Sequence, residues 1–286
     1  MAIALITGTS SGIGLATAVS LARRGHKVIA TMRNLPGATE LQKIISMEQL
    51  PITVADLDVN DDTSVERSIG RALAENGRID VLVNNAGLGL LGSVEELPLD
   101  VFREAMETNY FGPLRCIKAV LPSMRERRHG CIVNVTSISG RIALAPQAAY
   151  AASKWAFEAL SECLAQEMRA FNVRVAIVEP GVIATPIFSK ARPLLTESPY
   201  PHARRQQALF AASLAQPTSP YVVGEKICQI VDSDSWQLRY PVGPDAEPVL
   251  KWRASKTDEE IVQLGAASDE EYKMIAQREF GLDVNI

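Results

Sequence analysis

Ser137, Tyr150 and Lys154 have the side-chain types and the spacing that proton transfer requires. Tyr150 and Lys154 are four residues apart in a helical pattern, so they share one face of the helix. A lysine ammonium beside a phenol favours the ionised phenol, and a phenol whose pKa is lowered can exchange protons near neutral pH. Six tyrosines and nine lysines in 286 residues give about 0.2 such spacings by chance. The motif therefore needs support from the elements that would position it.

Apolar runs in the sequence predict these elements. Seven strand-like runs alternate with helical patterns, which favours a parallel sheet covered by helices. Five of the runs end in small, turn-prone residues, and ligands bind at the edge where parallel strands end. Ser137 lies at the end of the fifth run. The seven runs are 2–7, 27–32, 52–55, 81–83, 131–135, 173–178 and 237–241.

The first run leads into a glycine-rich turn that could hold a pyrophosphate. Gly8, Gly12 and Gly14 let the backbone turn tightly and approach a phosphate at the positive end of the next helix. Their G-x-x-x-G-x-G spacing differs from the G-x-G-x-x-G of many dinucleotide enzymes. Arg33 follows the second run, where a cation suits the 2′-phosphate of NADP and an acid would suit the ribose of NAD. These residues predict NADP, with a solvated loop arginine as the alternative.

Polar and small residues follow the third and fourth runs. Asp58 is placed to meet an adenine amino group, and Asp61 or Asp62 is expected to cap the following helix. The sequence Asn84-Asn-Ala-Gly87 allows an adenosine to pass close to the backbone, although such loops are often simple turns. This edge of the sheet is therefore expected to bind the adenosine half of the cofactor.

A long helical pattern from 98 to 127 contains Pro113, which has no amide hydrogen. The carbonyl of Asn109, four residues earlier, loses its helical donor and must find another partner. A water bound there would make Asn109 a relay toward Lys154. A simple kink in a curved helix is the alternative.

The last hundred residues change in character. The segment from about 186 to 220 is rich in proline, with an apolar helical stretch at 206–214. Long irregular insertions in compact folds are usually functional, so this segment is expected to be a substrate lid. A helical pattern at 222–231 and a charged extension from about 244 to 286 follow, with helical patches at 258–264 and 269–280. The chain, 1–286, is expected to form a single domain.

Composition argues against several classes of protein. The net charge of −4 and a single dense basic run at 125–129 argue against nucleic-acid binding. No signal peptide or bilayer-spanning apolar run is found, so a cytoplasmic protein without stable membrane insertion is expected. The three histidines are separated, are expected at the surface and form no metal site. Reduced core thiols are expected at Cys116, Cys131, Cys163 and Cys228.

Together these residues resemble the short-chain dehydrogenases/reductases in their compact form. The matching blocks cover about residues 3 to 190 in the expected order, and such an ordered set is highly specific. The segments 30–34 and 239–246 are similar to the branch that contains 17β-hydroxysteroid and retinol dehydrogenases. The blocks are 7–14, Asp58-Val59, 84–87, Asn109, Ser137, Tyr150-x-x-x-Lys154 and Pro180-Gly-x-x-x-Thr185.

The resemblance implies a doubly wound parallel sheet of the Rossmann type, with three α/β/α layers, and a nicotinamide cofactor. It implies a catalytic group of Asn109, Ser137, Tyr150 and Lys154. Ser137 and Tyr150 would donate to the carbonyl oxygen, and Lys154 would stabilise the phenolate and hold the ribose hydroxyls. The cofactor contacts it implies are Gly8, Ser10, Ser11, Gly12, Ile13, Gly14, Arg33, Asp58, Val59, Asn85, Ala86, Gly87, Tyr150, Lys154, Pro180, Gly181, Val182 and Thr185.

The predicted activity is the NADP(H)-dependent interconversion of a carbonyl and a secondary alcohol. Apolar residues at 88–93, 138–147 and 182–214 favour a medium-sized apolar substrate, such as a steroid, a retinoid or an aromatic ketone. The alternatives are a polyol or sugar dehydrogenase, a 3-oxoacyl reductase and an NADP-sensing protein without turnover. Some forty residues beyond the last strand count against the 3-oxoacyl reductase. The family expectation is a homodimer or homotetramer through the helices at 98–127 and 148–171.

Overall fold

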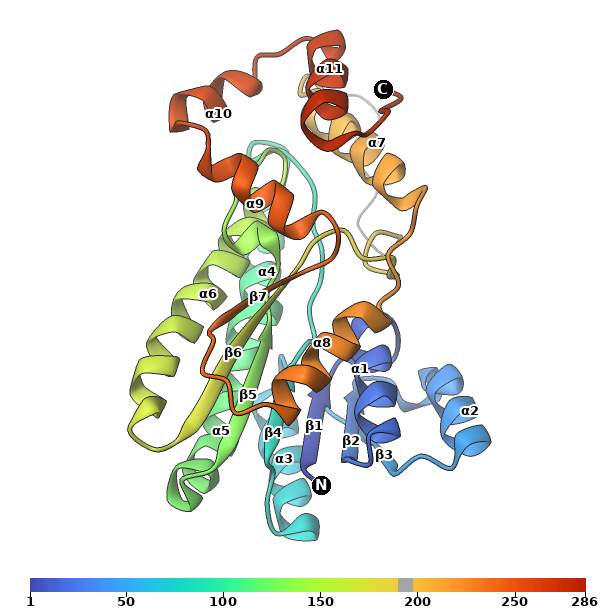
Figure 1. Cartoon of the computed structure of the whole chain (residues 1–286), viewed down its shortest axis with the longest axis vertical. Coiled ribbons are helices and arrows are strands. Elements are labelled where there is room, and N and C mark those ends of the chain that lie inside the picture. Colours follow the sequence, from blue (N-terminus) through green and yellow to red (C-terminus); the bar gives the residue numbers. More distant parts are fainter. Residues whose placement is uncertain (190–197) are drawn as a thin grey trace.

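The computed structural model describes residues 1–189 and 198–286, and a parallel β-sheet forms its centre (Figure 1). Among these residues, seven strands pair in the order β3-β2-β1-β4-β5-β6-β7. The order reverses between β1 and β4, which is the topological switch point of a doubly wound sheet. This confirms the predicted fold class. The strands are β1 (Ile3–Thr7), β2 (Lys27–Met32), β3 (Ile52–Asp56), β4 (Val81–Asn84), β5 (Gly130–Val135), β6 (Val173–Pro180) and β7 (Arg239–Val242).

Helices cover both faces of the sheet because most strand residues are buried on both sides. One apolar core joins the sheet to α1 (Gly12–Arg23), α2 (Thr39–Glu48) and α8 (Tyr221–Asp232). A second core joins the other face to α3 (Asp62–Asn76), α5 (Gly112–Arg127) and α6 (Ala148–Arg169). In the described part of the chain, no helix is both long and apolar enough to cross a bilayer.

The helix predicted from 98 to 127 is interrupted in the middle. It consists of α4 (Leu99–Met106), the π-helical turn η2 (Glu107–Phe111) and α5. Pro113 lies in the first turn of α5, where a missing amide hydrogen costs little. The wider π turn before it accommodates the change in hydrogen bonding and holds Asn109.

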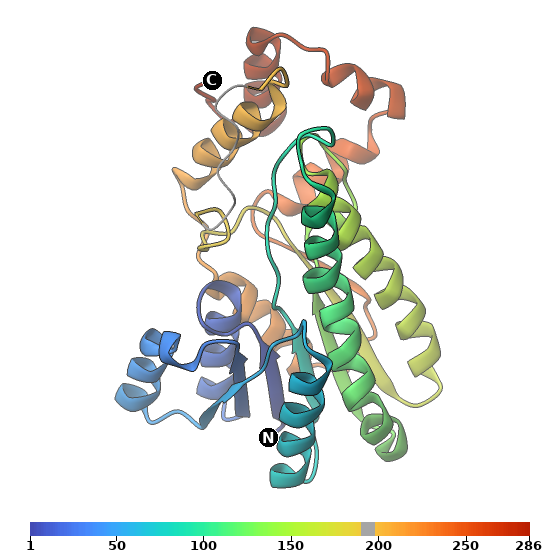
Figure 2. The ribbon, with the colours of Figure 1, turned by 180° about the vertical axis from the view of Figure 1, so that it is seen from behind.

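The C-terminal helices lie beyond the carboxyl ends of the strands, at the top of Figures 1 and 2. They are α7 (His202–Leu214), α9 (Ala246–Ala254), α10 (Asp258–Leu264) and α11 (Asp269–Phe280). Capping boxes at Thr257 and Ser268 start α10 and α11, which matches the two predicted patches. Helix α9 was not predicted. The predicted lid includes residues 190–197, which lie outside the described residues.

One core assignment and one surface assignment from the sequence are wrong. Cys163 is exposed on α6, whereas Cys116, Cys131 and Cys228 are buried as expected. His26 is only 8% exposed. The Ala2 amide donates to its Nδ1 at 3.1 Å, and its Nε2 lies 2.9 Å from Asp232. These partners are 24 and 206 residues away in the sequence, so no local pattern indicated the burial.

Candidate active site

A cavity of about 1880 Å³ lies along the edge where the strands end. The residues that follow β1 to β6 form one side of it, as expected for a doubly wound sheet. Helices α7, α9, α10 and α11 form the other side. Of the predicted site residues, all but Gly14 and Asn109 line this cavity.

Gly14 packs against the glycine turn, on Gly8 and the Asn85 side chain. A Cβ at this position would overlap the Gly8 carbonyl oxygen and lie 2.5 Å from Asn85 Nδ2. The Asn85 amide group donates to the carbonyls of Thr7 and Gly8 at 2.9 and 3.1 Å, which ties the loop after β4 to the turn. Gly14 therefore has a packing role, and its contact with the cofactor stays a prediction.

The glycine turn leaves the start of α1 open to an anion. Gly8 and Gly12 have φ angles of 71° and 60°, a region that favours glycine. The first turn of α1 contains no acidic residue, and Ser11 makes no side-chain cap hydrogen bond. Amide donors at a helix N-terminus without such partners are suited to a phosphate. The turn therefore fits the pyrophosphate of a dinucleotide.

Ser137, Tyr150 and Lys154 come together at the end of β5. The Ser137 hydroxyl donates to the Pro180 carbonyl at 3.5 Å and accepts from the Ser139 amide at 3.1 Å. It lies near enough to Tyr150 to act on the pKa of the phenol. Lys154 Nζ donates to the Val135 carbonyl at 3.1 Å and lies 5.8 Å from the centre of the Tyr150 ring. The two hydroxyls and the ammonium predicted from the sequence thus share one site.

The predicted lowering of the Tyr150 pKa by Lys154 is wrong. Burial raises the pKa of Tyr150, and the nearby Ser137 hydroxyl opposes this rise. Burial also lowers the pKa of Lys154 to about 8, while the nearby Glu158 carboxylate raises it. Desolvation of the charged forms outweighs the attraction between helix neighbours, and the degree of burial is set by the tertiary packing.

Asn109 is fully buried in η2 and holds the loop after β4. Its Oδ1 accepts from the Leu88 amide at 2.9 Å, and its Nδ2 donates to the Leu88 carbonyl at 3.0 Å and to Ser153 Oγ at 2.9 Å. Gly87 lies against both Asn109 Oδ1 and Lys154 Nζ. Asn109 is therefore near Lys154, and the water relay stays a prediction.

Comparison with known proteins bears on this geometry. The sequence profile of the short chain dehydrogenases matches residues 2–195. The chain belongs to the short chain dehydrogenase family. This confirms the predicted family. Proteins of this family are oxidoreductases that act on CH–OH and C=O groups with nicotinamide cofactors, so the chain is such an oxidoreductase.

The relatives also support the predicted branch. Retinol dehydrogenase 8 of Bos taurus is 37% identical over 265 residues, which cover 87% of this chain and 84% of that protein. The structure of a short-chain dehydrogenase from Streptomyces avermitilis has a TM-score of 0.81 and 34% identity, and covers 94% of this chain and 98% of that one. A variant of actinorhodin polyketide ketoreductase, solved with NADPH, has a TM-score of 0.74 and 27% identity, and covers 86% of this chain and 97% of that one.

In this short chain dehydrogenase, Asp245 is a site residue that the sequence did not indicate. Its Oδ2 accepts from the Val182 amide at 2.8 Å. Val182 is one of the predicted cofactor contacts, and in this structure its amide is engaged within the protein. The Asp245 carboxylate fits between Gly181 and Gly243, where added side chains would meet it. The role of Asp245 was not predicted because its partner Val182 is 63 residues away in the sequence.

The helical side of the cavity was also missed, except for part of α7. Edge-to-face aromatic pairs line it, with ring centres 5.0 Å apart for Phe188 and Phe210 and 5.1 Å apart for Trp252 and Phe280. Apolar residues three or four positions apart in α11 could have indicated a buried face. Further side chains on this side are Val249, Ile261, Leu264, Tyr272 and Ile275.

Proposed function

We propose that this protein is an NADP(H)-dependent enzyme that interconverts a carbonyl and a secondary alcohol at Ser137, Tyr150 and Lys154. The observation that carries the proposal is the meeting of the Ser137 and Tyr150 side chains at the cavity, one helical turn from Lys154. A pair of hydroxyls beside a cation provides the donors that a developing oxyanion requires.

The proposed mechanism assigns a separate task to each side chain. A bound nicotinamide supplies or accepts the hydride. Ser137 and Tyr150 donate hydrogen bonds to the carbonyl oxygen, where negative charge develops during reduction. Tyr150 then transfers its proton to this oxygen, and the Lys154 cation stabilises the phenolate that remains. Asn109, which holds the loop beside Lys154, supports a water that returns the proton from solvent.

The preference for NADP rests on the end of β2. Met32 and Arg33 stand where an NAD enzyme needs an acid, and Arg33 lines the cavity with Ser10. The Arg33 side chain is exposed, so a guanidinium there can reach a 2′-phosphate without a desolvation cost. Asp58, which follows β3, is available to the adenine.

The substrate class follows from the helical side of the cavity. Its aromatic and aliphatic walls favour a medium-sized apolar ketone or alcohol, similar to a steroid, a retinoid or an aromatic ketone. A polyol or sugar would need more polar partners for its hydroxyls. We propose that segment 186–220, as far as it is described, and the extension at 244–286 together enclose the substrate.

A substrate panel tests this function. Purified protein is mixed with NADPH or NADH and with steroid, retinoid, aromatic, acyl-thioester and sugar carbonyls, and the absorbance of the reduced cofactor is followed. We expect turnover with NADPH and an apolar carbonyl. Tight NADPH binding without turnover would support an NADP-sensing protein. A preference for acyl-thioesters would support a 3-oxoacyl reductase, and a preference for sugars would support a polyol or sugar dehydrogenase.

A dimer or tetramer and a cytoplasmic location are further proposals. Trp155 on α6 exposes 49% of its surface, and Phe111 beside α5 exposes 42%, which supports these helices as contact faces. Light scattering of the purified protein gives the number of subunits. Fractionation of cells that express the chain gives its location.

A further inference from the structure

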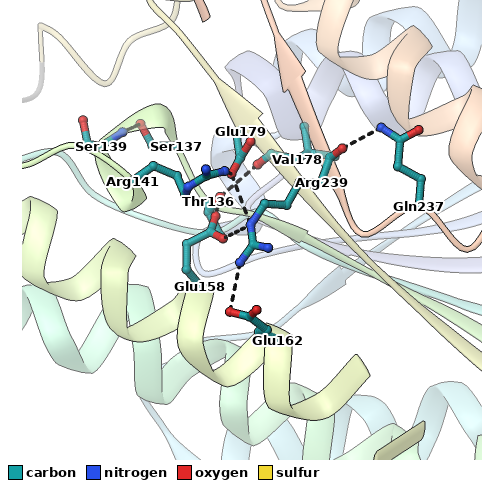
Figure 3. A network of polar contacts seen from close by, with 10 residues as sticks. All are labelled: Thr136, Ser137, Ser139, Arg141, Glu158, Glu162, Val178, Glu179, Gln237 and Arg239. Carbon is teal, nitrogen blue, oxygen red and sulfur yellow. Dashed lines mark hydrogen bonds and ion pairs between the residues drawn. The ribbon is translucent and has the colours of Figure 1, made fainter. Parts of the chain in front are cut away.

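A cluster of polar and charged side chains lies near Ser137 (Figure 3). We call it the Glu158 cluster, and it consists of Thr136, Arg141, Glu158, Glu179 and Arg239. Its two carboxylates are deeply buried, with Glu158 5% exposed and Glu179 fully enclosed. None of these residues has a part in the mechanism above.

Hydrogen bonds and ion pairs connect five elements within the cluster. Thr136 Oγ1 donates to Glu158 Oε1 at 2.6 Å, and Arg239 Nε donates to Glu158 Oε2 at 3.1 Å. Arg239 Nε also lies 3.6 Å from Glu179 Oε1, which accepts from Arg141 Nη1 at 3.1 Å. The end of β5, the turn η3 (Ile138–Gly140), α6, the end of β6 and β7 are thereby fastened together.

Three members of the cluster adjoin groups that take part in the reaction. Thr136 precedes Ser137 in the chain, and Glu158 follows Lys154 by one turn of α6. Glu179 precedes Pro180 and the loop that leads to Thr185. Each of these three cluster members is itself held by a hydrogen bond or an ion pair, so the chain beside it is held as well.

Gly140 lets the turn η3, which follows Ser137, pack against the Glu158 cluster. A Cβ at position 140 would lie 2.8 Å from Glu158 Cγ and 3.2 Å from the Lys154 carbonyl oxygen. The turn after Ser137 therefore rests directly on the Glu158 side chain. A change in the position of Glu158 would move this turn and Lys154 together.

Stability alone does not account for such a cluster. Two carboxylates taken out of water carry a large desolvation cost, and well-packed apolar residues often serve a fold equally well. Glu179 Oε2 is buried without a hydrogen-bond partner, so the cost is only partly offset. A positioning role is consistent with this cost, because charge-assisted bonds fix geometry more narrowly than apolar contacts do.

We propose that Glu158 and Arg239 are positioning residues, which hold the Ser137 hydroxyl and the Lys154 ammonium in the geometry of the reaction. The inference rests on the proposed function of this site. The inference also gives β7 a role, because Arg239 lies in this strand and binds Glu158. The placement of the catalytic residues then depends on the C-terminal part of the chain.

Glu158 also acts on the charge of Lys154. The ammonium faces the Tyr150 phenol and the Glu158 carboxylate from α6, the Val135 carbonyl from β5 and, across Gly87, the uncharged Asn109 amide. The carboxylate favours the ammonium form and so raises the pKa of Lys154 against the effect of burial. Removal of this charge lowers the pKa of Lys154, so the ammonium is lost at lower pH.

The decisive variant is Glu158→Gln, which keeps the shape of the side chain and removes its charge. Glu167→Gln is the matched control, because Glu167 is exposed on the same helix outside the cluster. We expect kcat to fall about tenfold in Glu158→Gln, with an unchanged dissociation constant for NADPH. The decline of activity at high pH should begin at lower pH than in the wild type and the control.

A second pair separates positioning from folding. Thr136→Ser keeps the hydroxyl that donates to Glu158, whereas Thr136→Val removes it and keeps the volume. We expect kcat to fall in Thr136→Val and to recover in Thr136→Ser, both measured well below the unfolding temperature. If Glu158→Gln and Thr136→Val matched the wild type in kcat and pH profile, the inference would be wrong.

One measurement does not depend on turnover. An NMR titration of the Lys154 Nζ resonance should give a lower pKa in Glu158→Gln than in the wild type and in Glu167→Gln. An unchanged Lys154 pKa would overturn the effect of Glu158 on the ammonium, even in an active enzyme. A wild-type protein that turns over no carbonyl would instead overturn the proposed function, and the titration would still decide the coupling.

Discussion

On one side of the cavity the walls are loops that follow β1 to β4, and on the other they are side chains of α7, α9, α10 and α11. We call these the strand side and the helix side. The strand side is held by backbone geometry and by short bonds such as those from Asn85 to the glycine turn. The helix side is held by aromatic pairs and by the ion pair between Arg205 and Asp269, at 2.8 Å.

This difference determines how each side responds to change. A loop whose backbone touches its neighbours cannot accept even a methyl group without moving. A wall of side chains on separate helices can lose atoms and leave a wider cavity. We therefore expect substitutions on the strand side to abolish cofactor binding, and those on the helix side to alter which substrates fit.

Tyr150 lies where the two sides meet, and its loss should have the largest effect. Tyr150→Phe removes the proton donor and one of the two oxyanion donors, so kcat should fall about a thousandfold or more. NADPH binding, measured by fluorescence titration, should stay within about twofold of the wild type. Tyr221→Phe, a change distant from the cavity, is the control. Substantial turnover by Tyr150→Phe would remove the residue from the mechanism.

Gly14→Ala tests the rigidity of the strand side. The new Cβ would meet the Gly8 carbonyl and Asn85, so the turn must open and NADPH affinity should fall about a hundredfold or more. Gly70→Ala is the matched control in α3, where nothing lies within 4 Å of the added atom. This control should bind NADPH normally and unfold with a free energy about 0.5–1 kcal/mol higher. Normal NADPH affinity in Gly14→Ala would contradict the packing argument.

The contrast between the two sides also explains what the sequence could predict. Glycine spacing and the residues after each strand are local signals, so the sequence predicted most residues that line the strand side and the meeting of Ser137, Tyr150 and Lys154. The roles of these residues stay predictions. Which residues of α9 and α11 face the cavity depends on how these helices pack. The apolar spacing in α11 indicates a buried face, but not what that face packs against. Asp245 and the raised pKa of Tyr150 were missed for the same reason, because both depend on residues distant in the sequence.

Arg33→Ala tests the contrast between the two sides of the cavity in another way. Backbone loops form most of the strand side, and this variant changes one of its side chains. Removal of the guanidinium should weaken NADPH binding about tenfold to a hundredfold, as expected for a hydrogen bond to a charged group. NADH has no 2′-phosphate, so its affinity should not change. Arg103→Ala, which removes an exposed arginine on α4 outside the cavity, is the control. An equal loss for both cofactors would assign Arg33 to the structure of the loop.

The smallest effect is expected on the helix side, from two neighbours in α11. Ile275 lines the cavity, whereas Met274 is 62% exposed and lies outside it. Ile275→Ala should lower kcat/KM for a bulky apolar ketone about three- to tenfold, because lost apolar contacts cost about 1 kcal/mol. It should leave a small ketone and NADPH binding unaffected, and Met274→Ala should change neither substrate. If both ketones lost activity equally in Ile275→Ala, α11 would support the catalytic residues as the strand side does, and the division into two sides would fail.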